Sequence, residues 1–288
     1  MIQARNKLSQ EELSEAKNLI NCCQAYDETY RDPYLSNMLN FDTNMPAFFL
    51  YYEKGELVGL LTVYADDPDV EVAILVHPNH RCQGIARALY RSFEKETASY
   101  PIESVTFQTE RIFLERHPDF ASNWGLVEDE ETETWLGKDR RPYPLANVSN
   151  LEVLLADRSY QDQISQLKFQ AFSEDHESRE VVDRYVAKAL KDPESLLYIL
   201  LKNGQVIGTC TVDLSSNTNY LFGLAIAELE RGKGYGTYLA KSLINQLIEQ
   251  NDKAFQIAVE DSNLGAKRLY EKIGFVKQTQ VVYLKPKV

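Results

Sequence analysis

The sequence has 288 residues, of which 44% are hydrophobic and 26% charged, a composition typical of a globular protein. No apolar run approaches the roughly 18 residues that a membrane span needs, and residues 1–7 lack the apolar core of a secretory signal, so we expect a cytoplasmic protein. The net charge of −12 argues against binding to a phosphate backbone. The four cysteines (Cys22, Cys23, Cys82 and Cys210) have no CxxC spacing, so neither a zinc site nor a disulfide framework is predicted.

The first half of the chain predicts a helix, three strands and a second helix. Ser9 is placed to cap the first helix, and a turn at Gly55 separates two strands of a hairpin. The third strand leads through a loop with Gly84 into the second helix. The predicted elements are the helix 8–22, the strands 47–52, 57–64 and 70–76, and the helix that starts at residue 85.

The second half repeats this order, with the helices 162–172 and 178–190 and the strands 195–202, 205–214 and 219–226. Three glycine pairs have nearly the same separation: Gly204 lies 149 residues after Gly55, Gly208 149 after Gly59, and Gly234 150 after Gly84. We therefore predict two homologous domains, 1–140 and 151–288, joined by a polar linker at 141–150 that contains two prolines. The fold class is α/β, with a mixed sheet and helices on both faces in each domain.

A strand, a glycine-rich loop and a helix follow one another in residues 221–238. Alternate glycines in Arg231-Gly232-Lys233-Gly234-Tyr235-Gly236 allow close approach of the backbone to a ligand, and the next helix presents its free N–H groups. The segment predicts an anion site for a phosphate or pyrophosphate, and the alternative is a glycine-rich turn without a ligand. The spacing differs from the GxGxxG of dinucleotide-binding folds and from the GK[ST] of phosphate-binding loops.

Two motifs resemble those of the GNAT N-acetyltransferase superfamily. The acetyl-CoA loop of that family, [QR]xxGx[GA], is similar to Arg231-x-x-Gly234-x-Gly236 and to Arg81-x-x-Gly84-x-Ala86. Its second signature is similar to Asn263-x-x-Ala266-x-x-Leu269-Tyr270-x-x-x-Gly274-Phe275, which follows a predicted strand at 254–259. The paired domains are similar in arrangement to the tandem mycothiol synthases. The resemblance implies transfer of an acetyl group from acetyl-CoA to a primary amine of a small molecule or peptide in a ternary complex, with CoA as product.

The resemblance also implies the roles of individual residues. Tyr270 would be the acid that protonates the leaving thiolate; its alternative role is a packed core aromatic. The positions implied to contact acetyl-CoA are Leu224, Ala225, Ile226, Arg231, Gly232, Lys233, Gly234, Tyr235, Gly236, Thr237 and Asn263. Arg231 and Lys233 are alternatively a solvated basic pair, and Asn263 alternatively only a helix cap. From the residues alone, Gly223 within a strand predicts a β-bulge or a close backbone approach.

The amino-terminal copy lacks the second signature. Pro118 and Ala121 stand where its counterpart of Tyr270 would be, so we expect this domain to be structural or to bind cofactor without turnover. The strand 219–226 carries no acidic residue, so no general base is assigned. His77 and His80 lack a third ligand, and no metal site is predicted. A protein that binds acyl-CoA as a sensor or scaffold without catalysis is the alternative function. The acceptor, the acyl-chain preference and the oligomeric state stay open.

Overall fold

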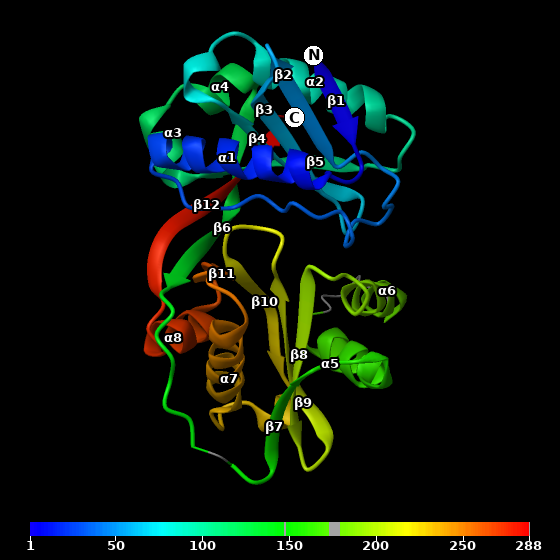
Figure 1. Cartoon of the computed structure of the whole chain (residues 1–288), viewed down its shortest axis with the longest axis vertical. Helices are drawn as coiled ribbons and strands as arrows, with labels where there is room; N and C mark the ends of the chain where they lie inside the picture. The colour runs from blue at the N-terminus through cyan, green and yellow to red at the C-terminus, as the bar shows by residue number, and fades with distance from the viewer. Residues whose placement is uncertain (147, 173–178, 288) are drawn as a thin grey trace. The chain divides into compact units, whose positions relative to one another are not determined.

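The computed structural model describes residues 1–146, 148–172 and 179–287, and it divides into two compact units (Figure 1). Unit 1 consists of Met1–Trp135 and Gln278–Val288, and unit 2 of Leu136–Lys277. The end of the chain thus returns to the first unit. The predicted domains, 1–140 and 151–288, are each continuous in sequence, whereas unit 1 is formed by two separate segments. Asn147 of the predicted linker and Ser178, the first residue of the predicted helix 178–190, lie outside the described residues. No helix in the described part is both long and apolar enough to cross a membrane.

Unit 1 contains one sheet, in the order β1-β2-β3-β4-β5-β12-β6. Strands β4 and β5 are parallel, and β12 is antiparallel to β5, so the carboxyl-terminal strand is inserted between β5 and β6. The elements are β1 (Ile2–Arg5), α1 (Gln10–Asp27), β2 (Phe48–Glu53), β3 (Glu56–Tyr64), β4 (Asp69–Val76), α2 (Ile85–Thr97), β5 (Ser104–Glu110), α3 (Arg111–Arg116), α4 (Phe120–Trp124), β6 (Leu126–Lys138) and β12 (Val276–Pro286).

The strands of unit 1 bury both faces, because successive side chains point to opposite sides of a sheet. Phe48 and Leu50 of β2 pack in the core cluster that includes residues of α1, whereas Phe49 packs in the cluster that includes residues of α2. The predicted cap of α1 is confirmed: the Ser9 hydroxyl accepts from the Glu12 amide at 3.1 Å, and the Glu12 carboxylate accepts from the Ser9 amide at 2.8 Å. Figure 1 shows α1 and α2 on opposite sides of the strands.

Unit 2 repeats the arrangement, with the strand order β11-β10-β9-β8-β7 and the last residues of β6 next to β11. Helices α7 and α8 cover one face, where they enclose the core cluster of this unit, and α5 and α6 cover the other (Figure 1). The elements are β7 (Leu151–Leu155), α5 (Gln161–Phe172), α6 (Arg179–Ala189), β8 (Ser195–Lys202), β9 (Gln205–Asp213), β10 (Asn219–Ile226), α7 (Tyr235–Gln250), β11 (Phe255–Glu260) and α8 (Leu264–Lys272).

Candidate active site

The parallel strands β10 and β11 of unit 2 are paired over a short stretch only. Their register runs from Asn219, opposite Phe255, to Leu221, opposite Ile257. Just beyond it, the pairing of β10 with β9 shifts between Phe222 and Ala225. The residues inside the shift are Gly223, with φ of +58°, and Leu224, so the bulge predicted at Gly223 is confirmed. A bulge at the place where two parallel strands part leaves backbone N–H and C=O groups for a ligand.

The loop after β10 has the backbone geometry of an anion cradle. Gly232 and Gly234 have φ of +74° and +85°, and a Cβ added at either would meet nothing within 4 Å. Gly234 is the N-cap of α7 and has no side chain that could cap the helix. The first N–H groups of α7 therefore have no side-chain cap, and the positive end of the helix dipole lies at this loop. The loop fits a phosphate or pyrophosphate held by backbone groups alone.

The charged side chains of this loop interact with the loop itself. Arg231 donates through Nε to the Ile226 carbonyl at 3.0 Å. Lys233 donates through Nζ to the Leu229 carbonyl at 2.7 Å and contacts the Glu230 carboxylate at 3.0 Å. Glu230 is shared with Lys202, whose Nζ lies 2.9 Å away. These contacts engage the Lys233 ammonium and the Nε of Arg231 within the loop.

At Gly236, helix α7 meets α8 and two of the predicted site residues in β10. A Cβ at Gly236 would lie 3.1 Å from Cδ1 of Leu269 in α8, 3.6 Å from Cγ1 of Ile226 and 3.7 Å from Cδ2 of Leu224 in β10. The glycine thus lets α7 approach both the bulged strand and α8. Ala225, between the two β10 residues, is 4% exposed.

The remaining residues implied to contact acetyl-CoA lie in the first turn of α7 and at the start of α8. Tyr235 and Thr237 flank Gly236 in the first turn of α7. The Tyr235 ring lies 5.1 Å below Nζ of Lys202. Asn263 caps α8, because its Oδ1 accepts from the Ala266 amide at 3.0 Å.

Tyr270 lies in the core cluster beneath α7 and α8 and is 5% exposed. Its ring packs edge-on against Phe275, with centroids 5.8 Å apart. Burial, with a smaller contribution from the Cys210 thiol, raises the pKa of the Tyr270 phenol above its usual range. The phenol is protonated at neutral pH, but its raised pKa makes it a weaker acid toward a thiolate, and its burial among core residues is also the geometry of a packed aromatic.

The loop of unit 1 has nearly the same backbone as that of unit 2. Cys82 has φ of +61° and Gly84 of +81°, at the positions of Gly232 and Gly234. Arg81 donates through Nε to the Val76 carbonyl at 3.0 Å, as the matching arginine does in unit 2. The left-handed conformation is thus kept in unit 1 even where cysteine replaces glycine.

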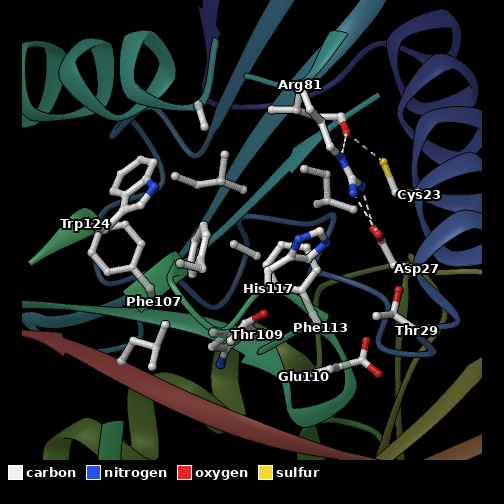
Figure 2. A pocket seen from close by; sticks show the side chains of 18 of the residues that line it. Cys23, Asp27, Thr29, Arg81, Phe107, Thr109, Glu110, Phe113, His117 and Trp124 are labelled. Carbon is white, nitrogen blue, oxygen red and sulfur yellow. Dashed lines mark hydrogen bonds and ion pairs between the residues drawn. The ribbon is translucent and has the colours of Figure 1, made fainter. Parts of the chain in front are cut away.

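Arg81 has a second partner that the sequence did not reveal. Its two terminal nitrogens lie 2.7 and 2.5 Å from the carboxylate of Asp27, at the end of α1, in a bidentate ion pair (Figure 2). This pair raises the pKa of the guanidinium. The neighbouring thiol of Cys23 contacts the Val76 carbonyl at 3.5 Å, and burial raises the pKa of this thiol to about 12.

A cavity of about 710 Å³ in unit 1 extends from the loop along β4 and β5. Figure 2 shows aromatic side chains around it, among them Phe107, Phe113 and Trp124. Helix α3 ends before Pro118, and Ala121 lies in α4. The aromatic residues at 107–124 were the only signal for this cavity in the sequence, and they do not by themselves indicate a ligand.

The fold and the two glycine loops define an acetyltransferase. The chain belongs to the acetyltransferase (GNAT) family, whose model matches residues 13–137 and again 161–275. Both units are therefore GNAT domains, and the chain is a tandem member of the family.

Among known relatives, the chain is similar to a mycothiol acetyltransferase of Clavibacter sepedonicus, with 25% identity over 230 residues, 76% of this chain and 73% of that protein. A GCN5-related N-acetyltransferase of Sphaerobacter thermophilus has a TM-score of 0.70 at 17% identity and covers 100% of this chain and 96% of its own. A tandem GNAT protein from the clavulanic acid biosynthesis pathway has a TM-score of 0.69 at 16% identity, covering 99% and 97%. The two structural likenesses concern the fold.

Proposed function

We propose that the protein transfers an acetyl group from acetyl-CoA to a primary amine and that unit 2 performs the reaction. The observation that carries this proposal is the bulge at Gly223, at the place where β10 parts from β11. The matching strand of unit 1, β4, pairs with β3 in an uninterrupted register from Tyr64 to Gly59. A thioester carbonyl needs a backbone donor aimed at its oxygen, and the bulge frees such donors in unit 2.

The loop and the bulge supply two complementary parts of a site for acetyl-CoA. Backbone N–H groups of residues 231–237 would hold the pyrophosphate, and residues 224–226 would hold the pantetheine arm and polarise the thioester oxygen. Asn263, whose Oδ1 caps α8, would contact the same arm. The acceptor nitrogen would attack the thioester carbon, the C–S bond would break, and Tyr270 would protonate the thiolate, while the proton lost by the acceptor nitrogen would restore the Tyr270 phenol. The raised pKa of Tyr270 makes this proton transfer more uphill than for an ordinary phenol, so the role requires the bound thiolate to lie directly against the phenol.

Unit 1 supports a second, narrower proposal: it binds an acyl-CoA without turnover. The left-handed backbone at Cys82 and Gly84 and the adjacent cavity favour binding. The uninterrupted register of β4 and the absence of a tyrosine at Pro118 and Ala121 disfavour chemistry. If unit 2 were also inactive, the whole chain would be an acyl-CoA sensor or scaffold.

The function is tested by release of CoA thiol from acetyl-CoA in the presence of defined amines. Spermidine, an α-amino acid, an aminoglycoside and a short peptide with a free amino terminus represent the classes of acceptor. The matched alcohol or N-acetylated form of each compound serves as control. We expect one class to accelerate CoA release at least tenfold over hydrolysis, with the mass of an N-acetyl product. Tight binding of acetyl-CoA with no acceleration by any amine would favour the sensor.

A further inference from the structure

Lys168 of α5 is a buried lysine in unit 2 to which the proposed reaction assigns no role. Its side chain is 5% exposed, and its Nζ lies 3.4 Å from the hydroxyl of Thr211. The rings of Tyr185 and Phe172 lie 5.4 and 5.9 Å from the same nitrogen. Among the described residues, no carboxylate forms an ion pair with it. Burial lowers the pKa of Lys168 to about 8, because the ammonium is poorly solvated here.

The amino group of Lys168 fills the space that the missing side chain of Gly223 leaves. A Cβ built on Gly223 would lie 2.7 Å from Nζ, closer than two such atoms can approach. Gly223 is the first residue of the bulge and lies two residues beyond Leu221, where the pairing with β11 ends. Lys168 therefore places a primary amine against the backbone that is proposed to polarise the thioester.

We propose that acetyl-CoA bound in unit 2 acetylates Lys168 of the same molecule. This inference rests on the proposed function, because it needs the thioester at the bulge. The lone pair of Nζ forms a bond to the carbonyl carbon, the C–S bond breaks, and one Nζ proton passes to the sulfur. The products are Nε-acetyllysine and the CoA thiol, and no further reactant is required.

The chemical state of Lys168 distinguishes it from the other lysines near the site. An amine of pKa about 8 is neutral in about a quarter of the molecules at pH 7.5, against about 0.1% for an exposed lysine. Lys202 and Lys233 share the Glu230 carboxylate, and Lys267 lies 2.5 Å from Asp261, so these three side chains are engaged in ion pairs. Only a neutral amine is a nucleophile. Lys168 is thus the reactive lysine beside the bulge.

The modification would limit the activity of unit 2. An acetyl-lysine has lost its charge and is larger than lysine by three heavy atoms, next to a glycine that leaves no room for a methyl group. The bulk would occupy the space that an incoming amine needs, and we expect acetylated protein to transfer more slowly. A supply of acetyl-CoA without acceptor would then switch the enzyme off.

The test is peptide mass spectrometry of the intact protein after incubation with doubly ¹³C-labelled acetyl-CoA at pH 7.5, without any amine. We expect label on Lys168 to accumulate at least tenfold faster than on the exposed Lys191. Its first-order rate should be independent of protein concentration, as a reaction within one molecule requires. Urea-unfolded protein and Gly234→Glu should lose this selectivity. Lys168→Arg and Lys168→Met should lose the label while they still bind acetyl-CoA in calorimetry.

Calorimetry separates the two ways in which the experiment can fail. If acetyl-CoA binds in unit 2 and Lys168 is labelled no faster than Lys191, this inference is wrong and the proposed function stands. Label on Lys168 that persists undiminished in Gly234→Glu also overturns it, because the donor would then come from solution. If the wild-type protein binds no acetyl-CoA, the proposed function fails and self-acetylation fails with it.

Discussion

The two units have kept the same anion loop and differ in the strand that leads to it. Cys82 and Gly84 reproduce the dihedral angles of Gly232 and Gly234, so this loop survives in unit 1 where the sequence has changed. In unit 2 a bulge at Gly223 interrupts the strand, whereas Ala73, 150 residues earlier, lies in regular pairing with Thr62. A loop that binds through backbone groups tolerates substitution, whereas a site for chemistry needs particular side chains and freed amides.

The strongest test of this comparison places a negative charge in each loop separately. Gly234→Glu should weaken acetyl-CoA binding to unit 2 by at least a hundredfold, about 2.7 kcal/mol, because a carboxylate would replace the pyrophosphate in the cradle. Gly234→Gln has the same size and backbone strain without the charge, and it should lose less affinity.

Calorimetric titration of the wild type, Gly84→Glu and Gly234→Glu counts the cofactor sites. A single site that is lost only with Gly234→Glu would assign binding to unit 2. Two sites, each lost with its own variant, would make unit 1 a true acyl-CoA binder. A single site that survives Gly234→Glu would contradict the assignment of unit 2.

Tyr270→Phe tests the chemistry without changing the volume of the core. We expect turnover to fall by about ten- to a thousandfold with acetyl-CoA affinity unchanged, which is the scale of a general acid. Tyr198, a core tyrosine of β8 that is 1% exposed, offers the matched control. Tyr198→Phe should leave turnover unchanged. Equal turnover in wild type and Tyr270→Phe would reduce Tyr270 to a packed aromatic.

The arginines of the two loops should contribute unequally to stability. Asp27→Ala should destabilise unit 1 by about 3 kcal/mol, because it leaves the guanidinium of Arg81 without its bidentate partner. In the described structure Arg231 forms no ion pair, and Arg231→Ala should cost no more than about 0.5 kcal/mol. Urea unfolding with hydrogen exchange on peptides of each unit measures both changes. If Asp27→Ala and Arg231→Ala lower the free energy of unfolding equally, the ion pair does not add to the stability of unit 1.

A methyl group at the bulge should be harmful only in unit 2. Gly223→Ala forces alanine into the left-handed region and brings its Cβ to 2.7 Å from Nζ of Lys168. We expect a loss of about 1–2 kcal/mol from the backbone alone. The double variant Gly223→Ala with Lys168→Met should regain the part of the lost stability that is due to the contact with Nζ, because the methionine side chain is flexible. In unit 1 the exchange Ala73→Gly should cost about 0.5–1 kcal/mol, the ordinary effect of glycine in a strand.

The last prediction concerns the dependence of stability on pH. The pKa of Lys168 is about 8 in the folded protein and about 10.4 in an unfolded chain, so the unfolded state binds more protons between these values. The free energy of unfolding should therefore rise with pH from about 8 to 10, by at most about 1.4 kcal/mol per pH unit. Below pH 8 the cost of burying the charged ammonium of Lys168 is fully present.

Among the described residues, the other titratable groups that face Lys168 are Cys210 of β9 and Tyr185 of α6, and burial raises the pKa of Cys210 to about 12. The thiol therefore stays neutral over the range in which Lys168 titrates. Urea midpoints of Lys168→Met and of wild type, measured from pH 7 to 10, give the contribution of the lysine. If the urea midpoint depends on pH in the same way in both proteins, Lys168 is not the source of that dependence.

Much of the molecule followed from the sequence alone. Patterns of period 2 and 3.6 predicted the hairpins, β10 and the helices after both loops, because local packing requirements repeat along the chain. Ser9 and Asn263 were recognised as helix caps, and Gly223 as a bulge, since each depends on a single residue and its neighbours. The paired glycines predicted the duplication, and the two signatures indicated the family.

Other features depend on contacts between distant residues, and only the tertiary structure decided them. The return of the last strand to unit 1, the ion pair between Arg81 and Asp27, and the cavity beside β5 all join segments that no local pattern connects. Lys168 is the clearest case. In the sequence it is one lysine in an amphipathic helix, and only the packing of α5 against the bulge buries its amino group, removes its water and thereby lowers its pKa.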